Sequence, residues 1–182
     1  MEDPGRSQTR QAIGRSRGGL TTKLHLAVDG RGLPLSILLT PGNVKDATAF
    51  PQVLGGIRIP RIATGRPRTT PVRVLGDKAY SSRAIRHLLR RRGIAVTSRT
   101  PSAATQRPAA GAEGPWAAGR RLRQGDLQRP QRGRTCSARL KQFRAIATRF
   151  DKLADRYRAG AILASRTLWL REPIRDHLSD TA

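Results

Sequence analysis

One acidic residue, Asp77, stands where a metal-binding carboxylate would be useful. It follows the short apolar run at 72–75 in the segment V-R-V-L-G-D-K-A-Y-S-S, which predicts a strand, a turn and then a helix. A carboxylate in that place can hold a divalent cation, because hard cations take oxygen ligands. A two-metal phosphoryl-transfer site needs several such acidic groups. The sequence offers only Asp77 in a suitable position.

Two histidines and two serines are weaker candidates for chemistry. His25 and His87 could be metal ligands, but no cysteine or carboxylate stands at zinc-site spacing from them, which favours ordinary polar positions. Ser81 and Ser82 could suggest a nucleophile. N-capping of the following helix is the simpler role for them.

Basic residues at several points along the chain could bind phosphate groups. The candidates are Arg15, Arg17, Lys23, Lys141, Arg144, Arg149 and Lys152. The alternative is that these side chains form a solvated polar face, and the sequence leaves both interpretations open.

A β-hairpin and a helix are expected before Asp77. Alternating residues at 22–28, the turn D-G-R-G and the returning apolar run at 33–40 predict the hairpin. Asp46 is expected to be the N-cap of a helix over A-T-A-F-P-Q-V-L.

A strand–helix–strand unit is expected around Asp77 itself. The strand at 72–75 leads to a helix from about 82 to 92, which Gly93 ends, and a strand at 94–97 follows. The order strand, strand, helix, strand, helix, strand indicates an α/β fold.

The pattern of apolar residues changes at Ser98. The following residues have neither a strand period nor a helix period and are expected to be disordered. Helical spacing of apolar residues returns near Ala138. A further helix is expected from about Tyr157 to Arg171, before Pro173. The apolar residues with helical spacing after Ala138 are Leu140, Phe143, Ile146, Phe150 and Leu153.

Charge is the strongest compositional signal in the 182 residues. The chain carries 36 Lys and Arg against 12 Asp and Glu, a formal net charge of +24. A polyanionic partner, most simply nucleic acid, follows from that charge. Mutational bias is the alternative, since 31 of the basic residues are Arg and 5 are Lys, as GC-rich coding would produce.

The remaining composition favours a soluble, cytoplasmic protein without a membrane partner. Cys136 is the single cysteine, which excludes an intrachain disulfide and fits a reducing compartment. The first residues lack the pattern of a secretory signal. The apolar stretch at 159–170 is too short for a membrane span and contains Arg166.

Three segments in order resemble the DDE-type transposases of bacterial insertion sequences. They are G-R-S-R-G-G-L-T-T-K-L-H-L-A-V-D-G-R-G-L-P at 14–34, L-G-D-K-A-Y-S-S at 75–82 and R-L-K-Q-F-R-A-I-A-T-R-F-D-K-L-A at 139–154. The resemblance implies a ribonuclease-H-like fold, in which two Asp and one Glu bind divalent metal, usually Mg²⁺, for DNA strand cleavage and joining. It also implies that Asp77 is the second Asp of this triad.

The other two members of the triad have no counterpart. The family places its first Asp on a strand upstream of position 14, but residues 1–13 contain no such strand, and Asp3 precedes a proline in a polar stretch. Asp29 matches a turn residue of the family and is expected to be structural. In the branch with the pattern Y-x2-R-x3-E-x6-K, Lys141 matches the final Lys, which puts Arg134 at the position of the Glu.

A frameshift would explain the missing Glu. Codons for residues 121–135, read one nucleotide later, can spell G-F-D-K-A-T-Y-N-A-R-N-V-V-E-R, which contains the Tyr, Arg and Glu at the required spacing. We therefore expect a frameshifted segment from about Ser98 to about Cys136.

The resulting prediction is a partial ribonuclease-H-like α/β domain that lacks its first strand, with a disordered insert and C-terminal helices. Its function is expected to be that of an insertion-sequence DNA transposase, here an inactive remnant that binds DNA ends and forms homo-oligomers. A non-enzymatic basic nucleic-acid-binding protein is the alternative. The expected parts are a disordered tail at 1–13, the partial catalytic domain at 14–97, the disordered, frameshifted segment at 98–137, the helical part at 138–172 and a tail at 173–182.

Overall fold

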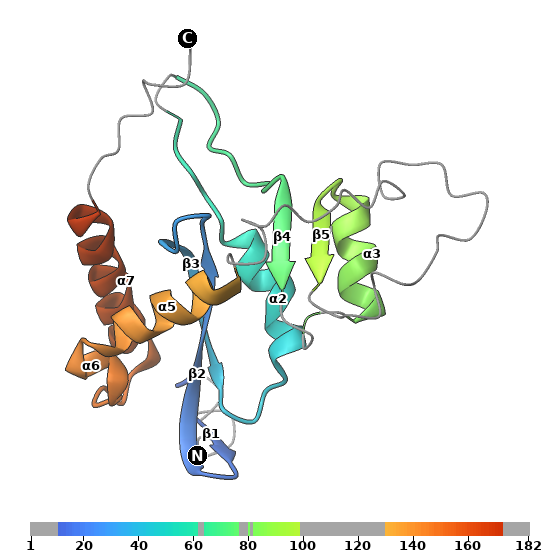
Figure 1. Ribbon diagram of the computed structural model, residues 1–182. Helices are drawn as coiled ribbons and strands as arrows, with labels where there is room; N and C mark the ends of the chain where they lie inside the picture. Colours follow the sequence, from blue (N-terminus) through green and yellow to red (C-terminus); the bar gives the residue numbers. More distant parts are fainter. Residues whose placement is uncertain (1–10, 62–63, 77–79, 81, 99–129, 173–182) are drawn as a thin grey trace.

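Two small sheets with helices packed around them make up the described part of the fold (Figure 1). The computed structural model describes residues 11–61, 64–76, 80, 82–98 and 130–172. Within these residues, one sheet has the strand order β1-β2-β3 and the other consists of β4 and β5. The mixture of helices and strands agrees with the α/β class that the sequence predicted.

The predicted β-hairpin is present. β2 (Gly19–Val28) pairs with β3 (Pro34–Pro41) in antiparallel fashion, with Leu24 opposite Leu39. Both leucines pack against the C-terminal helices, as alternation along a strand requires. A register shift between Ala27 and Val28 disturbs this alternation near the turn.

The strand that precedes the hairpin in the same sheet was not predicted. β1 (Gly14–Ser16) pairs with the first residues of β2, so that Gly14 lies opposite Thr21. The tight turn between the two strands uses Gly19 at a φ of 99°, a conformation that glycine adopts without steric cost.

Helix α2 (Asp46–Gly55) begins one residue earlier than expected. Lys45 occupies the N-cap position, and no side chain caps the helix, so the prediction that Asp46 is the N-cap was wrong. Asp46 is instead the first helical residue, where its carboxylate faces the positive end of the helix dipole. It forms an ion pair with Lys23 on β2 at 2.9 Å.

The strand–helix–strand unit around position 77 is present as predicted. β4 (Arg73–Gly76) and β5 (Ala95–Ser98) are parallel neighbours, and α3 (Arg83–Arg91) connects them. The hydroxyl of Ser82 accepts a bond from the backbone N–H of Ile85 at 3.3 Å. This bond confirms the N-capping role expected for Ser82.

Gly93 ends α3 with a pair of backbone bonds. The N–H of Gly93 donates to the carbonyl of Arg90, and the N–H of Ile94 donates to the carbonyl of Leu89, each at 3.0 Å. This is the Schellman arrangement, which needs a left-handed residue after the helix. Gly93 meets that need with a φ of 65°.

The C-terminal part differs from the prediction in two ways. α5 (Pro130–Lys141) begins well before residue 138, so the end of the segment expected to be disordered is helical; residues 99–129 lie outside the described part. The helical spacing after Ala138 also does not give one continuous helix. A short α6 (Arg144–Ala147) and α7 (Ala154–Arg171) follow α5 separately, and the helix expected from 157 to 171 is the main part of α7.

Two hydrophobic clusters hold these elements together. The first joins the hairpin to α5, α6 and α7 around Leu33, Cys136 and Leu140, each fully buried. The second lies between α2, α3 and the β4–β5 sheet, with Leu89 and Ile94 at its centre. The burial of Cys136 explains why α5 extends upstream, because an amphipathic helix needs this turn to complete its apolar face.

Candidate active site and nucleic-acid interface

Asp77, the predicted catalytic and metal-binding residue, lies outside the described residues, which stop at Gly76 and resume at Tyr80. The structure does describe what flanks it. Tyr80 packs on the second cluster, with its ring 5.9 Å from that of Phe50. The helix α3 then begins at the Ser82 cap. The strand and the helix that were expected to frame Asp77 are therefore both present.

Asp29 has a structural role, as expected. Its Oδ1 accepts backbone N–H bonds from Arg31 and Leu33, each at 2.8 Å, and its Oδ2 is 3.3 Å from Nε of Arg31. These bonds close the turn of the hairpin and use the carboxylate for local hydrogen bonding.

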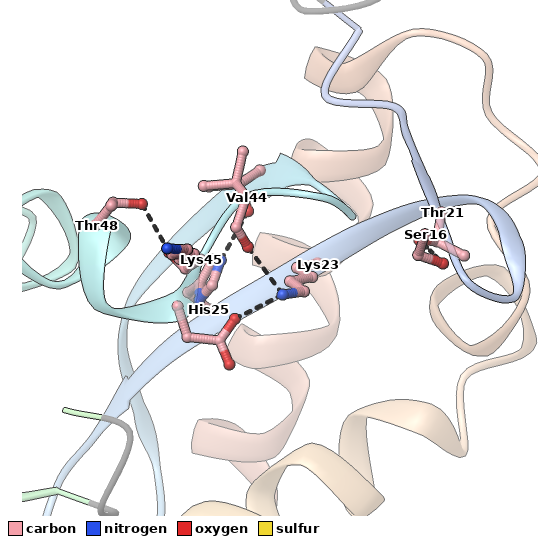
Figure 2. Close-up of polar contacts among 9 residues, drawn as sticks. Ser16, Thr21, Lys23, His25, Val44, Lys45 and Thr48 are labelled. Atoms are coloured by element: carbon pink, nitrogen blue, oxygen red, sulfur yellow. Dashed lines mark hydrogen bonds and ion pairs between the residues drawn. The ribbon is translucent and has the colours of Figure 1, made fainter.

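Lys23 makes internal contacts, although it was a candidate for DNA binding. Its Nζ donates to the carbonyl of Val44 at 2.8 Å and to the carboxylate of Asp46 at 2.9 Å (Figure 2). These contacts fasten the start of α2 to β2. The side chain of Lys23 is 39% exposed, so its charge is still accessible to solvent.

His25 is a buried polar residue that contacts the neighbouring strand. Its Nε2 is 2.8 Å from the hydroxyl of Thr40 on β3. Burial lowers the pKa of His25, the nearby Asp46 opposes this, and Lys23 adds to it. The other histidine, His87, is exposed on α3.

Arg149 is also engaged within the chain. Its guanidinium donates to the carbonyl of Gln11 at 2.7 Å and to the hydroxyl of Thr22, and it lies 5.2 Å over the ring of Tyr157. Burial lowers the pKa of Arg149, while Tyr157 and Asp151 raise it. Its contacts hold the N-terminal edge of the sheet, which leaves little of its donor capacity for phosphate.

The other five predicted DNA-binding side chains are exposed. Arg15 and Arg17 belong to the β1–β2 hairpin. Lys141 ends α5, and Arg144 begins α6 with its guanidinium 5.8 Å over the ring of Phe150. The remaining residue is Lys152, in the loop before α7. The structure thus divides these candidates between the hairpin and the C-terminal region.

A third basic region, on α3, was absent from the predicted set. Exposed Arg83 and Arg91 lie opposite the buried Ile85 and Leu89. The segment R-A-I-R-H-L-L-R-R-R could have predicted this basic region. Its apolar residues recur at helical spacing, and its remaining residues are Arg and one His.

No group of three or more residues able to hold a metal ion is found within the part of the chain that the structure describes. In the same part, no helix is both long and apolar enough to cross a bilayer.

Comparison with known proteins identifies the family. The model of the transposase DDE domain matches residues 3–166, which is most of the chain. The chain belongs to the transposase DDE domain family. The resemblance seen in the sequence is thereby confirmed, and the family match extends across the region that contains Asp77.

A curated relative supports the same family. A protein of Burkholderia cepacia, named as a transposase for insertion sequence element IS402, is 38% identical to this chain over 80 residues. The match covers 44% of this chain and 37% of the relative, so the chain matches little more than a third of the relative's length. No solved structure matches the chain.

Proposed function

We propose that the chain is an insertion-sequence transposase remnant that binds DNA and does not cleave or join it. The family match and the relative's name support DNA transposition as the parent activity. The segment L-G-D-K-A-Y-S-S supports Asp77 as the surviving metal-binding carboxylate, since it follows β4 and precedes the capped helix α3.

Arg134 is the observation that carries the proposed loss of catalysis. It stands seven residues before Lys141, where the family pattern places the metal-binding Glu, and it is exposed on α5. A guanidinium repels a divalent cation and has no lone pair to coordinate it. The change from Glu to Arg would therefore replace an attraction by a repulsion at the same site.

The donor set does not fit two Mg²⁺ ions. Metal-dependent strand transfer needs several oxygen ligands that also neutralise the cations. Asp77 would supply one carboxylate, Arg134 would supply none, and Asp29 is committed to the hairpin turn. We therefore assign no catalytic step to a metal in this chain.

The separation of the two sheets is compatible with a ribonuclease-H-like fold that lacks its first strand. Among the described residues, β2 pairs with β1 and β3, whereas β4 pairs with β5. In the family fold a strand that carries the first Asp would lie between the counterparts of β2 and β4. Such a strand would join the two sheets and supply the first Asp of the triad.

A strand-cleavage assay tests the loss of catalysis. The purified chain is incubated with Mg²⁺ and radiolabelled duplexes that carry the terminal sequences of the parent element. We expect no cleavage by the chain or by its Asp77→Asn variant. Mg²⁺-dependent nicking by the chain that Asp77→Asn abolishes would refute the proposal, and the paired variant excludes a contaminating nuclease.

The nucleotide sequence of the locus tests the proposed origin. The frame shifted by one nucleotide over residues 98–136 should encode the Tyr, Arg and Glu of the family pattern. If that frame does not encode them, Arg134 is native and the frameshift is rejected.

A second candidate function is that of a basic protein that binds nucleic acid without catalysis. The exposed arginines of the hairpin and of α3 favour it. The two candidates differ in what they require of Asp77. If the chain has a site built around Asp77, its binding of divalent metal should be sensitive to Asp77→Asn. If the chain only binds nucleic acid through charge, Asp77 is dispensable for that binding.

A further inference from the structure

The outer face of α3 is a basic surface on a firmly anchored helix. Arg83, His87 and Arg91 follow one another at spacings of four residues, so they share one stripe of the helix. All three are exposed. The opposite face carries Ile85 and Leu89, which are 4% and 1% exposed in the second cluster. The orientation of the basic stripe is therefore fixed by the core.

The charge of this region is almost uncompensated in the sequence. Residues 56–98 contain ten Arg and one Lys but a single acidic residue, Asp77. An excess of this size disfavours the compact state by self-repulsion and attracts polyanions. Arg86 and Arg90 lie on the same side of α3 but make contacts of their own within the chain. The stripe of Arg83, His87 and Arg91 does not include them.

A polar cavity adjoins the C-terminal end of the same helix beside Arg92, which follows the last helical residue and lies off the stripe of Arg83, His87 and Arg91. It has a volume of about 370 Å³ and is lined by Gly55, Thr69, Thr70 and Arg92. Nε of Arg68 donates to the carbonyl of Thr70 at 3.2 Å, which holds this wall of the cavity in place. A guanidinium beside threonine hydroxyls offers hydrogen-bond donors of the kind that contact phosphate oxygens.

We propose that the outer face of α3, with Arg83 and Arg91, and the C-terminal end of the helix, where Arg92 lines the cavity, together form a binding surface for the phosphate backbone of duplex DNA. The nine residues of α3 span about 14 Å at about 1.5 Å per residue. Duplex DNA presents one phosphate charge per about 1.7 Å of its axis, so about eight charges pass along such a length. Arginines at both ends of the helix can therefore contact separate phosphates.

This surface is distinct from the predicted contacts on the hairpin and the C-terminal helices. α3 and α7 lie on opposite sides of the molecule, with β4, β5 and α2 between them (Figure 1). The choice of DNA as the polyanion rests on the proposed function, but the location of the surface does not. Phosphate contacts fix position and carry no sequence information, so the binding should be independent of DNA sequence.

The test compares two triple variants of the full chain that remove the same charge. Arg83→Gln, Arg91→Gln and Arg92→Gln alter the proposed surface. Arg156→Gln, Arg166→Gln and Arg171→Gln alter exposed positions on α7 and form the matched control. Affinity for a fluorescent duplex of arbitrary sequence is measured by anisotropy over a series of salt concentrations.

We expect the α3 triple variant to bind duplex DNA about tenfold or more weakly at moderate salt. Its plot of log affinity against log salt should also be shallower by about three, since each lost phosphate contact lowers the slope by about 0.9. The control should change affinity by less than about threefold and leave the slope nearly unchanged. Circular dichroism of all variants reports whether the helices are retained.

A third variant separates lost charge from lost structure. Arg83→Lys, Arg91→Lys and Arg92→Lys keep the point charges, so affinity should stay within about threefold of the parent chain. Equal weakening by the α3 and α7 triple variants would overturn the inference while leaving DNA binding in place. A parent chain that binds no duplex at low salt would overturn both. Neither result depends on strand cleavage, which tests the parent activity separately.

Discussion

The guanidinium of Arg149 joins backbone groups from two distant parts of the chain. It donates to the carbonyls of Gln11 and Ala12 near the N-terminal edge and to those of Asp151 and Lys152 in its own loop. Hydrogen bonds from a charged donor are stronger than neutral ones, and each bond here also restrains a carbonyl in a loop. A single side chain thus ties the start of the described chain to the segment before α7.

Replacing Arg149 by Ala should loosen this N-terminal edge. We expect the free energy of local opening of residues 11–22 to fall by about 2 kcal/mol, because the carbonyls of Gln11 and Ala12 and the hydroxyl of Thr22 lose a charged donor. Hydrogen exchange of that peptide, followed by mass spectrometry, measures the change. Arg144→Ala serves as the control, since Arg144 is exposed and the variant should leave exchange of the same peptide unaltered. Equal protection in the two variants would show that the bonds of Arg149 contribute nothing.

At the scale of elements, what the sequence could predict depended on local signals. The hairpin, the Ser82 cap and the Gly93 stop are set by residues within a few positions of one another, and all three were predicted. β1 has three residues, too few for a periodic pattern. The internal role of Arg149 depends on partners 137 and 138 residues away, which local spacing cannot reveal. The start of α5 was missed because its apolar face depends on Cys136, which packs against the hairpin.

A substitution at Gly93 tests whether a local signal sets the end of α3. Gly93→Ala should cost about 1 to 2 kcal/mol in the local stability of α3, because alanine is strained at a φ of 65°. Apart from the chain neighbours of Gly93, no atom of the described residues lies within 4 Å of a Cβ at this position, so the cost comes from the backbone conformation and not from a clash. Hydrogen exchange of the α3 peptide measures it.

The matched control for Gly93 is Gly55, the last residue of α2. A Cβ at Gly55 would likewise meet no atom of the described residues within 4 Å beyond its chain neighbours and the backbone of α2, and the φ of Gly55 is not in the left-handed region. Gly55→Ala should therefore stabilise α2 by up to about 1 kcal/mol. The same chemical change should thus have opposite signs at the two positions, and equal signs would contradict the role assigned to Gly93.

At the scale of the whole molecule, the proposed absence of one strand would limit stability. Among the described residues, Thr22–Val28 of β2 pair with β3, while the ladder with β1 covers Gly19–Thr21. Backbone groups on the other side of β2 would be satisfied by the strand proposed to be missing. Each unmade backbone bond that is buried costs about 1 to 3 kcal/mol, against a domain stability of about 5 to 15 kcal/mol. Open strand edges also favour pairing between chains.

The purified chain should therefore unfold over a broad temperature range and associate as its concentration rises. Light scattering coupled to size-exclusion chromatography measures the association, and circular dichroism measures the width of the transition. High salt should not abolish the association, since backbone pairing is not ionic. A sharp, cooperative melt of a monomer would contradict this prediction.

The contact between Trp169 and the hairpin gives the molecule a built-in optical probe. The indole N–H of Trp169 donates to the carbonyl of Pro34 at 2.8 Å, and the Arg31 guanidinium lies 5.4 Å over the ring. The chain contains two tryptophans, and Trp116→Phe would leave Trp169 as the single long-wavelength emitter. Its emission spectrum and its quenching by iodide would then report whether α7 is docked on β3, and would separate undocking of this helix from melting of the α2–α3 half.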